Sequence, residues 1–296
     1  MTRPRRILKG EVVMGTRRCS ERRFFLRPGG TSNHIFMYCL ARACRITGVL
    51  LHEFQVLSNH YHIVFTDVHG NRAKFFQELN AFVARAVNRT FGHWESFFAP
   101  GSYNAPVLLD GNAIEKECLY TLCNAVEAGL VSSPEYWEGV CSWSMEYGDT
   151  KVVRRPEGFF RESMREEEVL ELHRPEDLYP ELDDDEARAK LRDKAKQYSK
   201  EFAKELRAKG GGFMGMKRVR KQPLQSSPTT REPRRGIKPT VAGNKWKRIE
   251  ALRTNKKFYE EHREARQRFE AGERDVEFPA GTYLMAKRFR VAVKKK

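Results

Sequence analysis

The residues best suited to chemistry lie in the short segment His60-Tyr61-His62. In an extended strand, residues two positions apart point to the same face, with about 7 Å between their backbones. Two neutral imidazoles in that arrangement can share one metal ion, while Tyr61 points into the core with Ile63 and Phe65. The alternative is that both histidines are partly exposed polar residues near the end of a strand.

A second pair of polar residues, Tyr120 and Asn124, lies one helical turn apart in the segment 112–128. The apolar residues of this segment define an inner helix face made of Ile114, Cys118, Leu122, Ala125 and Val126. Tyr120 and Asn124 fall on the opposite face. There they either pack against the second half of the chain or present a phenol and an amide oxygen to a common site.

These two pairs together make a coherent catalytic set. Two imidazoles and the amide oxygen of Asn124 would leave about three open positions on an octahedral ion, which phosphate oxygens can fill. The hydroxyl of Tyr120 could then attack phosphorus and form a phosphotyrosine. A free phenol is a weak nucleophile at neutral pH, so the metal must polarise the phosphate. The sequence contains no Ser-His-Asp arrangement, P-loop, GxGxxG or paired-carboxylate motif.

The elements that position these residues follow from periodicity and turn signals. The pattern predicts a strand over 11–15, a helix over 34–45 with Ser32 as its N-cap, strands over 49–56 and 59–66, and a helix over 73–91. One or two strands are expected in 97–109, then a helix over 112–128 capped by Asn112 and ended by Gly129. This order favours an α+β fold, with a ferredoxin-like or RRM-like antiparallel sheet and helices on one face.

Composition changes near residue 150 and divides the chain into a catalytic domain, 1–150, and a charged helical and linker extension, 151–296. Helices are expected over 184–208 and 244–272, and one small strand or hairpin arm over 278–296. Residues 217–257 contain fourteen Lys and Arg against Glu232 and Glu250 only. With Pro, Ser and Thr clustered at 223–240, this segment is typical of a basic, loosely ordered linker that binds DNA.

The formal net charge of +16 indicates a nucleic-acid partner, although ribosomal and RNA-binding proteins share such a charge. The basic residues expected to contact DNA phosphates form an N-terminal and a linker group: Arg5, Arg6, Arg17, Arg18, Arg22, Arg23, Lys217, Arg218, Arg220, Lys221, Arg234 and Arg235. Trp94, Phe97 and Phe98 could stack on bases, but packing in the core or at its rim is favoured.

The chain shows neither a signal peptide nor an 18-residue apolar run, so no membrane contact is expected. Its six cysteines form no CxxC pair and are interpreted as small buried hydrophobes in a reducing compartment. These features favour a cytoplasmic protein.

Two motifs resemble those of a known family. The segment LSNHYHIVF at 57–65 resembles the NHxH strand of HUH-type single-tyrosine transposases, and specifically of REP-associated tyrosine transposases. The segment YTLCNAVEAGLV at 120–131 is similar to their helix signature Tyr-x-x-x-Asn-Pro-Val-x-Ala-Gly-Leu-Val, with Ala125 in place of the proline. Loss of that proline should straighten the helix without chemical cost. The resemblance covers about residues 5–145.

The resemblance implies a metal-dependent transposase of HUH fold that nicks and rejoins single-stranded DNA, often folded as a hairpin of repeat sequence. His60, His62 and Asn124 would be metal ligands, and Tyr120 the nucleophile that forms a 5′-phosphotyrosine. The ion would be Mg²⁺ or Mn²⁺, with Mn²⁺ favoured by histidine ligation. Both monomeric and homodimeric action are compatible with the resemblance. The resemblance also implies a bacterial protein associated with the nucleoid.

Two other functions remain open at this level. A catalytically silent DNA- or RNA-binding regulator could use the same scaffold, although binding alone requires none of the four candidate site residues. A replication or plasmid-transfer initiator would often carry a helicase domain or a second tyrosine beside the first. The sequence has no ATPase motif, and no second tyrosine follows Tyr120 on its helix.

Overall fold

The computed structural model describes residues 4–101, 103–230 and 239–295. Its main sheet has the strand order β2-β3-β1-β4-β7, with antiparallel β1–β3, β2–β3 and β1–β4 pairs and a parallel β4–β7 pair. The strands are β1 (Glu11–Arg18), β2 (Leu50–Val56), β3 (His60–Asp67), β4 (Val107–Leu108) and β7 (Thr240–Val241). The predicted α+β class with an antiparallel-dominated sheet is confirmed.

One face of the sheet is covered by α1 (Gly30–Thr47) and α2 (Arg72–Phe91), which pack on each other. Alternate residues of β3 supply this side of the core. Tyr61 meets Phe36 of α1 with ring centroids 5.5 Å apart, and Phe65 meets Phe75 of α2 at 4.7 Å. The Tyr61 hydroxyl donates to Asn80 Oδ1 at 2.7 Å. The predicted inward orientation of Tyr61 is therefore confirmed.

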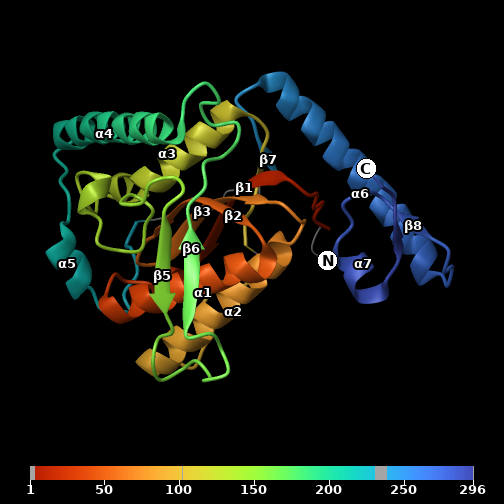
Figure 1. Cartoon of the computed structure of the whole chain (residues 1–296), viewed down its shortest axis with the longest axis horizontal. Helices are drawn as coiled ribbons and strands as arrows, with labels where there is room; N and C mark the ends of the chain where they lie inside the picture. The colour runs from red at the N-terminus through yellow and green to blue at the C-terminus, as the bar shows by residue number, and fades with distance from the viewer. Residues whose placement is uncertain (1–3, 102, 231–238, 296) are drawn as a thin grey trace.

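The opposite face is covered by α3 (Gly111–Glu127), with α4 (Asp184–Ala208) packed outside it (Figure 1). The expectation of helices on one face therefore describes α1 and α2 only. The reason is visible in β2 and β3, where His62, Val64 and their neighbours on both faces are buried. Strands that are apolar or buried on both faces need a cover on each side.

Two predicted helix N-caps, Asn112 and Ser32, lie two and three residues from the observed ones. α3 begins one residue before Asn112, because the Asp110 carboxylate accepts a hydrogen bond from the Ala113 N–H and acts as N-cap. α1 begins at Gly30 after an N-cap at Gly29, so Ser32 lies inside the first turn. The Ser32 hydroxyl instead donates to the Arg27 carbonyl at 2.7 Å.

Residues after 150 contribute to the same core. A hairpin of β5 (Thr150–Arg154) and β6 (Glu167–Glu171) packs on α1, where Arg45 pairs with Glu168 at 2.6 Å. One continuous hydrophobic cluster runs from Val13 to Leu191 of α4. The helix expected over 184–208 is confirmed at both ends, since α4 has the same bounds. Two short 3-10 turns, η1 (Ser20–Arg22) and η2 (Pro134–Tyr136), complete this part.

The C-terminal segment forms a smaller unit around its own cluster of Ala265, Val276, Phe278 and Met285. Its elements are α6 (Lys245–Glu270), β8 (Glu277–Phe278), α7 (Leu284–Phe289) and β9 (Ala292–Val293). The short helix α5 (Met216–Lys221) belongs to the main body, where Val219 packs in a cluster with Leu57 and Ala125. β8 and β9 pair in parallel around α7, so the expected hairpin arm is replaced by a strand-helix-strand unit. Figure 1 shows α6 extending away from the main sheet.

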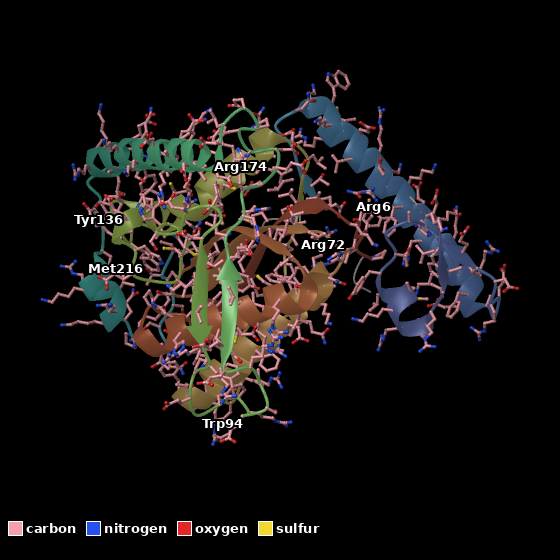
Figure 2. The ribbon with its side chains drawn as sticks, in the orientation of Figure 1. Arg6, Arg72, Trp94, Tyr136, Arg174 and Met216 are labelled. Atoms are coloured by element: carbon pink, nitrogen blue, oxygen red, sulfur yellow. The ribbon has the colours of Figure 1, made fainter. Side chains whose placement is uncertain are left out.

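The N-terminal segment joins this unit to the main sheet. The Ile7 N–H donates to the Gly281 carbonyl at 3.0 Å, and Arg6 forms a bridge with Thr282. In Figure 2, Arg6 lies between the main body and the C-terminal helices. Within the part of the chain that the structure describes, no helix is both long and apolar enough to cross a membrane.

Candidate active site

The two histidines of the HxH segment lie at the start of β3 and share the face covered by α3. His60 pairs with Arg18 of β1, while His62 stands between Thr16 of β1 and Gln55 of β2. The ring centroids of His60 and His62 are 4.9 Å apart and their planes are nearly perpendicular. The strand therefore brings both imidazoles into one small volume, as the i, i+2 spacing predicts.

α3 brings Tyr120 and Asn124 to these histidines. Asn124 Oδ1 lies 3.1 Å from His60 Nε2, and the Tyr120 ring meets the His62 ring edge-on with centroids 5.1 Å apart. All four predicted site residues thus converge from segments about sixty residues apart.

The predicted orientation of this helix was wrong in one respect. Asn124 is buried against the sheet, so Tyr120 and Asn124 do not lie on a face turned away from it. The side of α3 away from the sheet is covered by α4, where Cys123 Sγ donates to the Ala195 carbonyl at 3.6 Å. Because the helix is buried from two sides, its apolar stripe does not reveal which flank meets the sheet.

His62 has the environment of a neutral imidazole. It is 5% exposed, and neither ring nitrogen has a hydrogen-bond partner among the described residues. Burial holds the pKa of His62 well below its usual range, and the neighbouring His60 lowers it further. Buried polar atoms normally have partners, so two orphaned imidazole nitrogens beside another histidine fit a ligand that binds a lone pair.

The donor set at this position is two imidazoles and one amide oxygen. Across the described ranges, no group of three or more His, Cys, Asp or Glu side chains is arranged to hold a metal ion. The candidate set is of a different kind, because its third member, Asn124, is an amide and would contribute an uncharged carbonyl oxygen. Such a neutral set fits a divalent ion whose charge is balanced by an incoming phosphate.

Asn59 is a site residue that the sequence reasoning passed over, although it directly precedes His60. Its Oδ1 lies 2.6 Å from His60 Nδ1, and its Nδ2 donates to the Arg22 carbonyl at 3.1 Å. An Nδ1–H that donates to Asn59 leaves Nε2, the nitrogen facing Asn124, as the lone-pair atom. Its position within the NHxH segment was the available signal.

Gln55 is a second residue that the sequence reasoning missed. Its Nε2 donates to the Leu122 carbonyl at 3.1 Å, and its Oε1 accepts from the Ala125 N–H at 2.9 Å. The alanine that replaces a proline in the helix signature therefore uses the N–H that a proline would lack. The expectation that this replacement straightens the helix without chemical cost did not include this hydrogen bond.

Most of the N-terminal arginines predicted to contact DNA are also engaged within the protein. Arg5 stacks on the Tyr103 ring and donates to its carbonyl, and Arg17 donates to the Gly101 carbonyl at 2.7 Å. Partners of three others are Asn255 for Arg6, the Thr230 carbonyl for Arg22, and Glu21 with Gln225 for Arg23. Arg18 is the last residue of β1, and its side chain is exposed.

The linker group lies partly on α5. Lys217, Arg218 and Lys221 are exposed there, and Arg220 pairs with Glu138. Arg234 and Arg235 lie outside the described residues.

Residues 222–230 run along the N-terminal segment, where Arg27 donates to the Gln222 carbonyl and the Phe24 N–H donates to the Ser226 carbonyl at 3.0 Å. Because Leu26 and Arg22 bond to Ser58 and Asn59, this basic stretch lies close to the segment that leads into His60.

The candidate stacking aromatics separate into two kinds. Phe97 and Phe98 are buried in the core, as the favoured interpretation predicted. Trp94 is 90% exposed and projects into solvent beyond the end of α2 (Figure 2).

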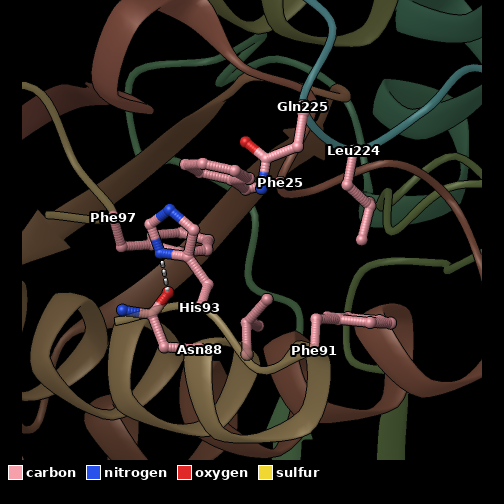
Figure 3. A pocket seen from close by; sticks show the side chains of 8 residues that line it. Phe25, Asn88, Phe91, His93, Phe97, Leu224 and Gln225 are labelled. Atoms are coloured by element: carbon pink, nitrogen blue, oxygen red, sulfur yellow. Dashed lines mark hydrogen bonds between the residues drawn. The ribbon is translucent and has the colours of Figure 1, made fainter. Parts of the chain in front are cut away.

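A small pocket beside that end of α2 contains none of the four site residues. It is lined by Phe25, Val87, Asn88, Phe91, His93, Phe97, Leu224 and Gln225 (Figure 3). His93 Nδ1 and Asn88 Oδ1 are joined across 3.2 Å. The four candidate site residues therefore lie outside this pocket.

Solved structures that are similar to this chain include two transposases. One is a REP-associated tyrosine transposase bound to a REP hairpin, with 16% identity and a TM-score of 0.41, covering 48% of this chain and 82% of that one. The other is a candidate transposase from Deinococcus radiodurans R1, with 16% identity and a TM-score of 0.28, covering 36% of this chain and 84% of that one. No protein-family model and no curated protein matches the sequence.

Proposed function

We propose that this protein is a transposase: a metal-dependent endonuclease and strand transferase for single-stranded DNA, acting on hairpin or repeat sequences through Tyr120. The observation that carries the proposal is the convergence of His60, His62, Tyr120 and Asn124 on one face of the sheet. The two motifs that resemble those of REP-associated tyrosine transposases contain these same four residues.

The chain's own residues have distinct roles in this reaction. His60, His62 and Asn124 would hold a divalent cation, Mg²⁺ or Mn²⁺, which when bound polarises the scissile phosphate. Asn59 holds the His60 ring through Nδ1, so that Nε2 faces the site. His62 stays neutral because it is buried, and therefore keeps a lone pair available.

Tyr120 supplies the nucleophile. Its hydroxyl oxygen forms a bond to phosphorus, the P–O3′ bond breaks, and the phenolic proton ends on the leaving 3′ oxygen. The DNA then carries a free 3′-OH on one side and a 5′-phosphotyrosine on the other. Attack by another 3′-OH restores a phosphodiester and returns the proton to the tyrosine, so no ATP is required.

A trapped covalent complex tests this proposal directly. The full chain is incubated with a labelled library of single-stranded hairpins and Mn²⁺, and the products are separated on a denaturing gel. The wild-type protein should give a covalent band that requires metal, and Tyr120→Phe should give none. Tyr136→Phe is the matched control, since Tyr136 is an exposed tyrosine outside the site.

A covalent band that survives in Tyr120→Phe would exclude Tyr120 as the nucleophile. Retained hairpin binding with no band in either protein would favour the catalytically silent DNA-binding regulator. Sequencing the trapped strand would identify the cleavage site.

A further inference from the structure

Gln55 lies directly opposite His62 in the antiparallel β2–β3 pair, so the two side chains project from the same face of the sheet. Gln55 is 1% exposed, beneath α3. A buried primary amide needs hydrogen-bond partners for both its oxygen and its nitrogen. The partners that Gln55 uses are both backbone groups of α3.

These partners flank the turn that contains Asn124. The Leu122 carbonyl accepts from Gln55 Nε2 at 3.1 Å, and the Ala125 N–H donates to Gln55 Oε1 at 2.9 Å. One side chain of β2 therefore holds two points of a single helical turn. Two directional bonds to one rigid amide fix both the height and the rotation of that turn.

The apolar contacts around this turn do not impose the same restraint. Ala125 and Val126 pack with Leu57 in a small hydrophobic cluster. Dispersion contacts of this kind are non-directional and allow small shifts of a helix. The 3.1 Å distance between Asn124 Oδ1 and His60 Nε2 depends on where the turn sits over the sheet.

We propose that Gln55 is a positioning residue, which sets where Asn124, and Tyr120 one turn earlier, stand relative to His60 and His62. The inference rests on the proposed function, since it concerns the assembly of that same site. Ligand atoms must be placed within about 0.2 Å for a metal, and a displacement of about 1 Å in a reacting group can reduce a rate about 100-fold. Loss of the Gln55 amide should therefore weaken metal binding even when the protein stays folded.

Gln55→Met tests the proposal because it keeps the length and approximate volume of the side chain and removes both hydrogen bonds. Mn²⁺ affinity of the full chain without DNA is measured by electron paramagnetic resonance titration, beside the rate of covalent complex formation. We expect Mn²⁺ binding about 10-fold weaker than in the wild type. We also expect covalent complex formation that partly recovers at high Mn²⁺ concentration.

A second substitution tests the cause. Proline has no N–H, so the Gln55→Met Ala125→Pro double variant also removes the N–H group that donates to Gln55 Oε1 in the wild type. It should recover part of the lost affinity, whereas Ala125→Pro alone should weaken it because Gln55 Oε1 then lacks its partner. Ser142→Ala is the matched control. It removes buried side-chain hydrogen bonds to Phe54 and Glu53 of β2, whereas the Gln55 amide bonds to α3, so it should lower thermal stability but not Mn²⁺ affinity.

The outcomes separate the two proposals. Wild-type Mn²⁺ affinity in Gln55→Met, with loss in His60→Ala, overturns the positioning role alone. Wild-type affinity in His60→Ala overturns the metal site and the proposed function with it. If Gln55→Met does not fold, Ala125→Pro decides: unchanged affinity in that variant overturns the inference.

Discussion

Asn59 Oδ1 lies 2.6 Å from His60 Nδ1, while Asn124 Oδ1 faces the other nitrogen of the same ring at 3.1 Å. The Asn59 contact fixes the tautomer and the rotation of an imidazole that the proposed function makes a metal ligand. Partners of this kind typically contribute 10–100-fold to metal affinity.

Asn59→Ala is therefore expected to weaken Mn²⁺ binding about 10-fold or more. The titration follows the paramagnetic signal of free Mn²⁺ with the full chain. Asn88→Ala is the control, because Asn88 makes the same kind of contact to His93 outside the site. Equal losses in the two variants would contradict a specific role for Asn59.

Arg188 of α4 and Glu53 of β2 form an ion pair in which both side chains are 0% exposed. Ser142 Oγ donates to Glu53 Oε2 at 2.5 Å, and Arg188 Nε donates to the Met145 carbonyl at 2.9 Å. Removing one member would leave the other as an uncompensated buried charge. This network ties α4 to the strand next to the histidines.

Arg188→Met should lower the free energy of unfolding by about 3–5 kcal/mol, measured by urea denaturation. Arg154→Met should lower it by less than about 1 kcal/mol, because the Arg154–Glu167 pair is largely exposed. Adding Glu53→Gln to Arg188→Met should restore part of the loss. A small effect of Arg188→Met alone would show that the pair is dispensable.

Much of the fold around the site follows from periodicity. The alternation over 59–66 places Tyr61, Ile63 and Phe65 in the core and the histidines on the other face, as observed. The helix expected over 73–91 is α2, which begins at Arg72. These elements are predictable because each buries one well-defined apolar face.

Other features depend on contacts between distant segments, which a local pattern does not encode. The two-residue strands β4 and β7 are defined by their pairing with distant segments: β4 pairs with β1, and β7 pairs with β4. β5 and β6 were missed because each strand has only five residues and breaks the usual alternation, with Val152 and Val169 exposed and Glu168 buried. Arg17 and Arg22 donate to carbonyls 84 and 208 residues away. Their positive charge suggested contacts with DNA, because these distant partners are not visible in the sequence.

His52 predicts a pH dependence of stability. It is fully buried, with Nδ1 2.7 Å from the His173 carbonyl and Nε2 2.7 Å from Thr66 Oγ1. Burial lowers the pKa of His52 to about 4 from the usual 6.5. The unfolded chain therefore binds a proton between these values that the folded chain does not.

The stabilising contribution of His52 is complete above pH 6.5 and is lost as the pH falls through about 4. The full loss amounts to about 3 kcal/mol. Urea denaturation of the wild type at pH 7.5 and pH 5 should show the decline, and His52→Gln should reduce it. His34→Gln, at an exposed position, is the control. An unchanged slope in His52→Gln would assign the decline to other groups.

The first half of α6 presents a basic surface. The sequence placed these residues in the basic segment 217–257, which was expected to be a loosely ordered linker, and named none of them as a DNA contact. Residues 245–257 contain six Lys and Arg against Glu250 alone, and all six basic side chains are exposed. Trp246, in the first turn, is 74% exposed. Asp110, the N-cap of α3, also accepts from the Gly243 and Asn244 N–H groups at 3.0 Å, which fixes the start of α6 beside the helix that carries Tyr120.

If this surface binds the proposed single-stranded DNA, Arg248→Glu should weaken binding and reduce the slope of log affinity against log salt by about 0.7 or more. Trp246→Ala should weaken binding by about 1–3 kcal/mol through lost stacking on a base, with little change in that slope. Both are measured by fluorescence anisotropy with a labelled hairpin bearing a single-stranded tail. Arg263→Glu is the matched control, since Arg263 is exposed in the half of α6 that contains four Glu and three Arg. Equal effects of Arg248→Glu and Arg263→Glu would indicate that net charge, and not this surface, governs binding.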